Sequence, residues 1–474
     1  MVLENTHWYY RTFDELESRL DFVFYHPDFD FIKSFRKSDK TFKSGNIISE
    51  PEYGNSLSGK ETGVTGFLNG QHISETGELI FKENALYVDA LLPDGDLLEI
   101  DNILISRSGT VGKATVITDE YEGFAFGSFY IRFRIKDKST YLPAFFSKFI
   151  NSDLGVKQIE LLKTGSVQSN INSDQIKDIN IPEIKSTRQK EILKQIAPLE
   201  TESKTLKAKA TKLQNEAVNY ILEVLGIETP ESPNYFFKSG AEKQTLTFDV
   251  FPDAIDDRLH YLYLHPKYKA LEEVKAKFKT VSLESICTKA IAPGVQPIYD
   301  DTGEIIVLKT VDLKNKYIDY DNALRVSAEF YKANKFAEVH KGEIILAATG
   351  YVSMGKVDIY DNDEPALISG ELLSFKVNDN YDPYFIAYFL RSHLGQIQIE
   401  KYWTGSSGQI HLYDKDVNKF IIPSYESISK AKQTEIAKAI RKKIEEAIRL
   451  EKQAIEKQTE AKRFFERLVM AGIK

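Results

Sequence analysis

The sequence predicts an α+β fold in which two duplicated mixed α/β domains are joined by two long antiparallel coiled-coil helices. Two observations lead to this prediction. Stretches of the first half return in the second half, in the same order and at an offset of about 240 residues. Each half also ends in a long segment whose small or apolar residues recur in alternating steps of four and three. Such steps are typical of the seam of a coiled coil.

The internal repeat defines two modules of one design. Five pairs of stretches carry it, namely 19–27 and 258–266, 102–113 and 343–356, 164–166 and 404–406, 181–182 and 422–423, and 189–196 and 433–440. The conserved order makes chance a poor explanation. We therefore predict a first module over 1–185, a central helix over 186–226, a linker over 227–245, a second module over 246–424 and a C-terminal helix over 425–474.

The central helix is predicted over Ser186–Gly226. At 1.5 Å per residue, about 40 helical residues span roughly 60 Å. Pro198 predicts a kink or a late helix start, and Gly226 ends the helix. The predicted seam residues are Ile192, Ile196, Leu199, Ser203, Leu206, Ala210, Leu213, Ala217, Tyr220 and Val224.

The second long helix is predicted over Thr434–Met470 and carries two polar seam positions, Glu451 and Gln458. A polar seam residue weakens packing but can fix register and partner choice. Either helix alone could be an ordinary core helix, but one at the end of each half favours an antiparallel pair. Its predicted seam contacts include Ile440, Ile444, Ala447, Ala454, Ala461, Phe465 and Leu468.

Within each module, the sequence predicts short strands separated by glycine turns, with helices at the margins. The alternation of β-branched and aromatic residues predicts the strands, and a proline at or near the start marks each helix. The expected strands are 100–105, 113–117 and 129–135 in the first half and 343–347, 356–360 and 372–377 in the second, and the expected helices are 141–151 and 384–391.

Composition narrows the class of protein. Hydrophobic residues make up 42% and aromatic residues 12% of the chain, enough for sizeable cores. The single cysteine, Cys287, excludes an intrachain disulfide and a cysteine-rich zinc site. No basic leader precedes an apolar run and no apolar run has the length of a membrane span, so we expect a cytoplasmic protein.

The charge distribution constrains DNA binding. The net charge is −8, and both predicted modules are acidic whereas both predicted helices are basic. A nucleic-acid-binding domain usually carries a basic patch. Any contact with DNA must therefore depend on local clusters of basic side chains.

Motifs of catalysis are missing or incomplete, so we expect no enzymatic activity in this chain. The Gly112-Lys113 pair lacks the upstream glycine of a phosphate loop, and no His/Cys cluster has metal-ligand spacing. The segment Asp382–Tyr384 is interpreted as a helix start. The nuclease-like set Pro252, Asp253, Glu273 and Lys275 lies in a helical context, and the histidines before proline, His26 and His265, are interpreted as structural.

Several segments are candidates for DNA contact. A segment with three phenylalanines and one acid carries Lys33, Arg36, Lys37, Lys40 and Lys43. Such cations can bind phosphates, although a solvated edge is an equally good interpretation. Polar loops that begin Thr-Gly-Ser recur in both halves and offer donors and acceptors suited to bases or phosphates. With the glycine turns, the further candidates are Arg107, Ser108, Lys113, Thr164, Ser166, Gln168, Asn170, Thr349, Tyr351, Lys356, Thr404, Ser406, Ser407 and Gln409.

The ordered set of motifs resembles a known family. Asp101–Lys113, Thr164–Ile171, Ile181-Pro182 and Gln189–Ile192, which return as 343–356, 404–409, 422–423 and 433–436, are similar to the specificity subunit of Type I restriction–modification enzymes. The resemblance covers nearly the whole chain. The second half departs from it with Ala347-Ala348-Thr349 in place of Ser106-Arg107-Ser108, so the two loops need not touch DNA alike.

That resemblance implies two target-recognition domains, each reading one half of a bipartite, asymmetric site in double-stranded DNA. It also implies that the helices are a spacer that docks methyltransferase subunits, two in number, with a motor-nuclease subunit as a further partner. S-adenosylmethionine would be the cofactor of the methyltransferase, and this chain would hold no cofactor or metal. The alternative from another class is a coiled-coil scaffold with two protein-binding modules and no DNA contact, which the acidic modules would suit.

Overall fold

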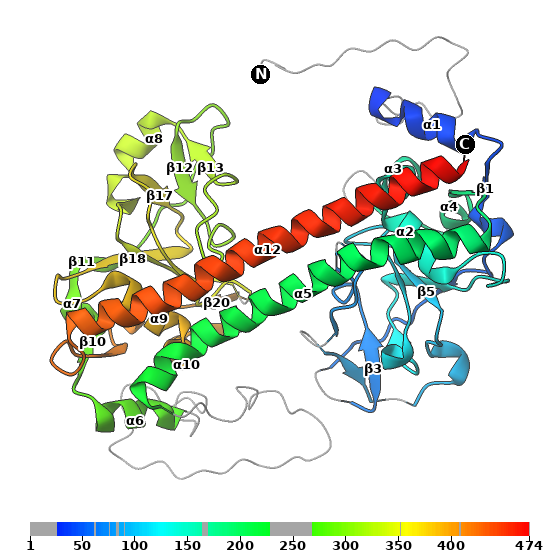
Figure 1. The fold of residues 1–474 in the computed structure, drawn as a ribbon. Coiled ribbons are helices and arrows are strands. Elements are labelled where there is room, and N and C mark those ends of the chain that lie inside the picture. The colour runs from blue at the N-terminus through cyan, green and yellow to red at the C-terminus, as the bar shows by residue number, and fades with distance from the viewer. Residues whose placement is uncertain are drawn as a thin grey trace. The chain divides into compact units, whose positions relative to one another are not determined.

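The computed structural model describes residues 26–60, 63–74, 76–81, 85–89, 91–163, 169–227, 268–350, 352–406 and 409–473 (Figure 1). Its contacts divide the chain into two compact units. Unit 1 comprises residues 1–203, 236–244 and 455–474, and unit 2 comprises residues 204–235 and 245–454. The predicted linker, apart from residue 227, lies outside the described residues, as do His265, Pro252 and Asp253. Glu273 and Lys275 lie within a helix, as predicted.

The first module is built from short strands and marginal helices, followed by the long helix α5 (Ser186–Leu225). Its elements are η3 (Pro27–Phe29), α1 (Asp30–Arg36), β1 (Thr41–Lys43), η4 (Ser44–Asn46), β2 (Glu52–Tyr53), β3 (Thr65–Leu68), β4 (Tyr87–Val88), η6 (Asp94–Asp96), β5 (Ile103–Ser106), β6 (Ala114–Val116), η7 (Asp119–Tyr121), β7 (Ala125–Phe126), β8 (Tyr130–Phe133), α2 (Pro143–Asn151), α3 (Asp153–Leu162), α4 (Ser173–Lys177) and β9 (Asn180–Pro182).

The second module repeats this order and leads into α12 (Lys430–Ile473). Its elements are α6 (Lys269–Lys277), β10 (Thr280–Ser282), α7 (Leu283–Ile286), β11 (Cys287–Pro293), β12 (Ile305–Leu308), β13 (Leu324–Val326), α8 (Ala328–Ala333), η10 (Lys335–Ala337), β14 (Glu338–Val339), β15 (Ile344–Ala347), β16 (Val357–Ile359), β17 (Ala366–Ile368), β18 (Leu372–Val377), α9 (Pro383–Arg391), α10 (His393–Tyr402), β19 (Thr404–Ser406), β20 (Gln409–His411), α11 (Asp414–Val417) and β21 (Ile421–Pro423).

Sheet topology confirms the predicted duplication. The first module has an antiparallel sheet in the order β2-β8-β5-β6, and the second has β11-β18-β15-β16. A smaller sheet in each module contains one parallel pair, β3 with β7 or β12 with β17. A two-stranded ribbon, β1-β9 or β10-β21, precedes each long helix. The predicted α+β class is therefore correct for both halves.

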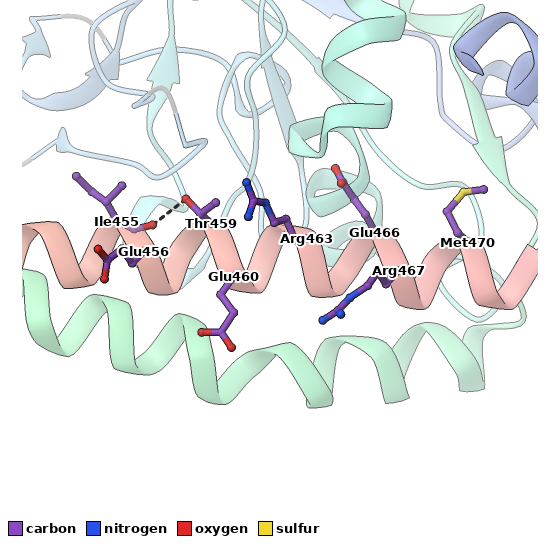
Figure 2. A pocket seen from close by; sticks show the side chains of 8 residues that line it. All are labelled: Ile455, Glu456, Thr459, Glu460, Arg463, Glu466, Arg467 and Met470. Atoms are coloured by element: carbon purple, nitrogen blue, oxygen red, sulfur yellow. Dashed lines mark hydrogen bonds between the residues drawn. The ribbon is translucent and has the colours of Figure 1, made fainter. Parts of the chain in front are cut away.

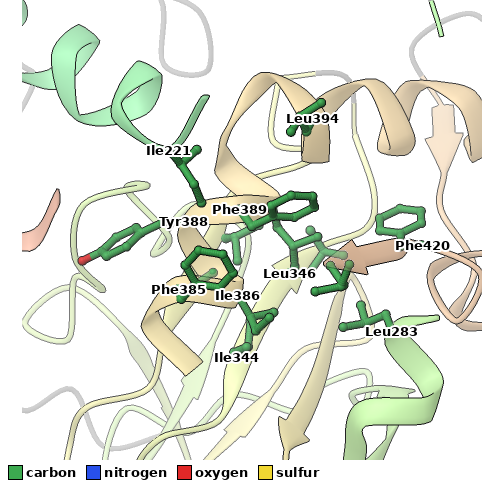
Figure 3. Packing of buried hydrophobic residues seen from close by; sticks show 14 of the residues in the cluster. Ile221, Leu283, Ile344, Leu346, Phe385, Ile386, Tyr388, Phe389, Leu394 and Phe420 are labelled. Atoms are coloured by element: carbon green, nitrogen blue, oxygen red, sulfur yellow. The ribbon is translucent and has the colours of Figure 1, made fainter. Parts of the chain in front are cut away.

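The cores bury aromatic and β-branched side chains between the larger sheet and the helices. In unit 2, Ile221 of α5 joins Phe385 and Phe389 of α9 and Ile344 and Leu346 of β15 in one buried cluster (Figure 3). In unit 1, α2 contributes Phe145, Phe146 and Phe149 to a cluster that includes Phe465 of α12. Each long helix is thus part of a module core as well as of the helix pair.

A buried glutamine joins the same two elements in each module. Gln158 of α3 accepts the N–H of Asn180 at 2.9 Å and donates to the Asn180 carbonyl at 2.9 Å. Gln398 of α10 makes the same pair of bonds with Ile421, at 2.6 and 3.2 Å. Gln158 and Gln398 are both fully buried, so their amides satisfy backbone groups that would otherwise lack these partners.

Within each unit, α5 and α12 pack side by side and antiparallel. In unit 2, Ala210 lies with Ala447 and Leu450 in one cluster, and Lys443 pairs with Glu216 at 2.7 Å. In unit 1, Lys457 lies 3.4 Å from Glu202. Of the predicted seam contacts, Ile440, Ile444 and Phe465 are buried, and Leu199, Leu206, Leu213, Tyr220 and Leu468 are partly buried.

Two details of the predicted helices are wrong. A late start at Pro198 does not occur, because α5 begins at Ser186 and runs through Pro198. Val224 is not a seam residue, since 36% of it is exposed while Ile221 and Leu225 are buried. The last turns of α5 face the broad core of the second module rather than a single partner helix, so the buried stripe shifts there.

Candidate nucleic-acid interface

A tight loop, residues 107–113, follows β5 in the first module. Gly112 donates its N–H to the Ser106 carbonyl at 2.7 Å, and Lys113 donates its N–H to Ser106 Oγ at 2.9 Å. Gly109 and Gly112 have positive φ values of 74° and 86°, a conformation that favours glycine. Ser106 and the two glycines therefore shape the loop, which carries the candidates Arg107, Ser108 and Lys113.

The second module carries the equivalent loop, residues 348–356, after β15. Gly355 donates to the Ala347 carbonyl at 3.0 Å, and Gly350 and Gly355 have φ values of 85° and 82°. This loop has two more residues between its glycines than the first. The extra length presents Val352, of which 87% is exposed. Thr349 and Lys356 are partly buried, and Tyr351 lies outside the described residues.

One backbone hydrogen bond joins each loop to the polar segment of its own module. Ile171 donates to the Arg107 carbonyl at 3.1 Å, and Leu412 donates to the Ala348 carbonyl at 2.8 Å. The two candidate segments of each module are therefore adjacent, although they lie about 60 residues apart in the sequence. This equivalence places the repeated motifs at one site in each module.

The polar segment of the second module is a β-hairpin rather than a simple loop. Thr404–Ser406 pairs with Gln409–His411, and His411 also bridges Thr349. Thr349 Oγ1 lies 3.4 Å from His411 Nδ1. In the first module, Asn170 precedes Ile171 and is partly buried. The candidates Thr164, Ser166, Gln168 and Ser407 lie outside the described part of the chain, and Ser406 and Gln409 belong to β19 and β20.

The basic segment of the first module lies on α1 and β1. Asp178 pairs with two of its members, Arg36 at 2.5 Å and Lys43. Burial, followed by the charge of Arg36, lowers the pKa of Lys43. Lys37 and Lys40 are exposed, and Lys33 is partly buried. Because they are exposed, Lys37 and Lys40 are candidates for phosphate contact.

Two residues next to the loops were not predicted from the sequence. Tyr53 of β2 lies beneath Arg107, whose Cζ is 4.9 Å from the centre of the tyrosine ring. His411 lies beside Thr349 and stacks with Tyr413 at 6.3 Å between ring centres. His411 follows a repeated motif directly and could have been found, whereas no local pattern links Tyr53 to Arg107.

The polar seam position Glu451 connects the helix pair of unit 2 to the second module. Its Oε1 accepts Gln214 Nε2 of α5 at 2.5 Å and Lys316 Nζ of the β12–β13 connection at 2.7 Å. The neighbouring Asn315 donates its N–H to Asp358 of β16 at 2.9 Å. Asp358 also pairs with Arg391. These bonds fix the connection between the second module and its part of the helix pair.

A shallow groove runs along the last turns of α12. Figure 2 shows the side chains that line it: Ile455, Glu456, Thr459, Glu460, Arg463, Glu466, Arg467 and Met470. Acids and bases are mixed, and Ile455 is 63% exposed at one end. No group of His, Cys, Asp and Glu among the described residues could hold a metal ion. No described helix combines the length and apolar composition needed to cross a bilayer.

Comparison with known proteins finds one matching family model and several solved structures that are similar to this chain. The model of the Type I restriction modification DNA specificity domain matches residues 69–215 and 275–460, well over half of the chain. No curated protein matches the sequence significantly.

Solved structures that match over most of both chains have low identity. A structure of the type I R-M system, solved for its complex assembly and conformational transition, is 12% identical over 92% of this chain and 97% of its own, with a TM-score of 0.43. The S subunit of a Type I restriction-modification system from M. genitalium is 13% identical over 90% and 95%, with a TM-score of 0.41. The HsdS subunit from Thermoanaerobacter tengcongensis is 12% identical over 91% and 96%, with a TM-score of 0.32.

Proposed function

The chain belongs to the family of Type I restriction modification DNA specificity domains and is a DNA-recognition subunit of such a system. From this premise we propose that each of its two modules reads one half of a split, asymmetric DNA site. The observation that carries the proposal is the loop pair joined by the same backbone bond in both modules. Arg107 and Ser108 occupy one loop where Ala348 and Thr349 occupy the other. Because the two loops share a backbone arrangement but carry different side chains, they should read half-sites of different sequence.

The helix pair is proposed as the spacer and as the docking surface for two methyltransferase subunits. Both helices are basic, and the exposed Ile455, which lines the groove on α12, offers an apolar contact for a protein partner. Interfaces of this kind combine an apolar centre with a polar rim. Seven residues added to a helix lengthen it by about 10 Å, so helix length would set the distance between half-sites.

We propose that the catalytic activities belong to the partner subunits. This chain would bind and orient DNA, the methyltransferase would carry S-adenosylmethionine, and a motor-nuclease subunit would join the same complex in the cytoplasm. The support is the absence from the sequence of a complete catalytic or cofactor motif together with the family. Methyl transfer by the purified chain, free of partner, would contradict this division.

The decisive experiment is co-expression with a methyltransferase partner, followed by mapping of methylated positions in genomic DNA. The expected motif has two unlike half-sites separated by a gap of indifferent sequence, with centres about one to one and a half helical turns apart, at about 34–36 Å per turn. A continuous or palindromic motif would be incompatible with the proposal. No methylation and no DNA binding would favour the scaffold alternative.

A matched variant tests the spacer directly. One heptad would be inserted between Ser203 and Lys204 of α5 and one between Ala454 and Ile455 of α12, where the two compact units divide. A heptad preserves the seam, so both half-sites should stay the same. The gap should lengthen by about three base pairs, which corresponds to about 10 Å of helix. A half-site that changes, or a gap that does not, would contradict the spacer role.

A further inference from the structure

Arg107 of the first module is held in place from three directions. Its N–H donates to the Phe129 carbonyl at 2.9 Å, and its carbonyl accepts from Ile171 at 3.1 Å. Its Cζ lies 4.9 Å from the centre of the Tyr53 ring. The side chain is partly buried, and Nε is buried without a hydrogen-bond partner in the described part of the chain. Its position is therefore fixed, and no described residue accepts a hydrogen bond from its guanidinium.

Other arginines of this module have acidic partners. Arg36 pairs with Asp178, Arg132 with Glu52, and Arg134 with Glu99. Among the described residues, no acid pairs with Arg107. A guanidinium that is stacked on a ring and lacks an anion has its hydrogen-bond donors available for a ligand. The ligand that this loop meets should therefore offer acceptors in a plane.

We propose that Arg107 reads a guanine in the half-site of the first module and that Tyr53 is the residue that positions it. The proposal rests on the DNA-recognition function proposed above. A guanidinium only donates hydrogen bonds, and guanine presents two acceptors, N7 and O6, on its major-groove edge. Adenine and cytosine present an amino donor there, and thymine presents one acceptor and a methyl group. Stacking on Tyr53 restricts the plane of the guanidinium, which favours a bidentate contact.

The second module supports this assignment by its differences. Gly54 donates to the Tyr130 carbonyl at 3.2 Å, and Gly294 makes the equivalent bond to Leu372 at 3.1 Å. The residue before each glycine is Tyr53 in the first module and Pro293 in the second. Arg107 likewise corresponds to Ala348. Both members of the stacked pair, Arg107 and Tyr53, are therefore different residues in the second module, although the backbone hydrogen bonds around them are the same. The second half-site should lack this guanine contact.

The first test compares methylation motifs. The complex of the full chain with its methyltransferase partner would be made with the native chain and with Arg107→Ala, Arg107→Lys, Tyr53→Ala and Tyr53→Phe. Arg134→Ala is the matched control, because it removes one positive charge from the same module at a site paired with Glu99. Arg107→Ala should relax one guanine of one half-site, Tyr53→Ala should relax the same position partly, and Tyr53→Phe and Arg134→Ala should keep the native motif.

The second test measures binding of the same complexes to a duplex that carries the mapped motif. Replacing the assigned guanine by 7-deazaguanine removes the N7 acceptor. The native complex should lose roughly five- to a hundred-fold in affinity, whereas Arg107→Ala should be indifferent to the replacement. The same measurement tests the guanine contact even if the Arg107→Ala complex binds DNA too weakly to methylate it. In that case the native and Arg107→Lys complexes can be compared on the two duplexes.

Two results would overturn the inference. One is a native complex that does not distinguish 7-deazaguanine at any guanine of that half-site. The other is an Arg107→Ala complex that weakens equally on all sequences with a reduced salt dependence, which would identify a phosphate contact. A native chain without any sequence-specific motif would instead contradict the proposed function, so the two failures can be told apart.

Discussion

Gln189, on the first turn of α5, accepts the backbone N–H of Leu142 at 2.8 Å. Its amide nitrogen donates to the carbonyls of Thr140 and Ile184, at 3.1 and 2.7 Å. Gln433 of α12 repeats the arrangement with Asp382, at 2.9 Å. Both glutamines are fully buried. Each long helix is thereby fixed to the start of the helix, α2 or α9, that covers the sheet of its own module.

Replacing Gln189 by Leu should destabilise unit 1. The substitution keeps the volume roughly constant but leaves the Leu142 N–H and the Thr140 and Ile184 carbonyls without this partner. The bond to Ile184 is buried, and an unsatisfied buried group costs about 1–3 kcal/mol. Urea unfolding would measure the loss. Gln195→Leu is the control, because Gln195 is exposed on the same helix and should change stability by less than about 0.5 kcal/mol. Equal effects of the two changes would contradict the structural role of Gln189.

Leu206→Asp should separate the helix pair of unit 2. Leu206 packs against the cluster of Ala210, Ala447 and Leu450, and a carboxylate there would be desolvated without a partner. A loss on the order of 2 kcal/mol is expected, together with loss of methyltransferase docking. Co-purification with the partner and urea unfolding are the measurements. Lys209→Asp, at an exposed position of α5, is the control, and docking that survives Leu206→Asp would count against the seam.

Lys37→Ala combined with Lys40→Ala should weaken DNA binding on all sequences alike. Both side chains are exposed, and each lost phosphate contact should reduce the slope of log affinity against log salt by about 0.9. Fluorescence anisotropy at several salt concentrations would measure the slope. Arg36→Ala is a useful comparison, since it breaks the ion pair with Asp178 and should affect stability instead. An unchanged slope would support the interpretation of this segment as a solvated edge.

The stability of unit 2 should fall as pH rises from about 4 to about 6. Burial raises the pKa of Asp358 to about 6, although the charge of Arg391 opposes the rise. The folded state then holds this proton to a higher pH than the unfolded state, so deprotonation costs folding free energy. Relative to Asp358→Asn, which does not titrate, the native protein should lose roughly 1–3 kcal/mol across that window.

Fluorescence of Trp403 in a Trp8→Phe background would follow that unfolding, since the chain has two tryptophans. The difference between native and variant proteins isolates Asp358 from the other carboxyl groups. A difference that is flat, or that favours the native protein as pH rises, would mean that the attraction of Arg391 outweighs burial.

Local periodicity was sufficient to predict much of the fold. The four-three spacing from Ile192 onward predicted a long helix, and α5 is observed over Ser186–Leu225. Glycines with positive φ located the turns after β5 and β15, because only a few residues adopt that conformation readily. The predicted module boundaries and the predicted contacts with DNA stay predictions.

Long-range pairing could not be predicted in the same way. Nothing near Arg107 in the sequence indicates Tyr53, since the two meet only after β2 has paired with β8 and β8 with β5. The Thr404–Ser406 segment was expected to be a loop, and its pairing with Gln409–His411 depends on hairpin formation across two residues. Val224 was assigned to the seam because the heptad pattern was extended to the end of α5. There the helix packs against the core of a module instead of a single helix.

The composition of unit 1 has a consequence for synthesis on the ribosome. Its core includes Phe465 and Val469 of α12, and the ring of Phe465 lies 5.3 Å from that of Phe145. At about 5–20 residues per second, roughly 15–60 s separate the emergence of Phe145 from that of Phe465. During that interval the nascent first module presents an uncovered aromatic face. The core of unit 1 is therefore completed only after the second module has been synthesised, even though the sheet of the first module is made first.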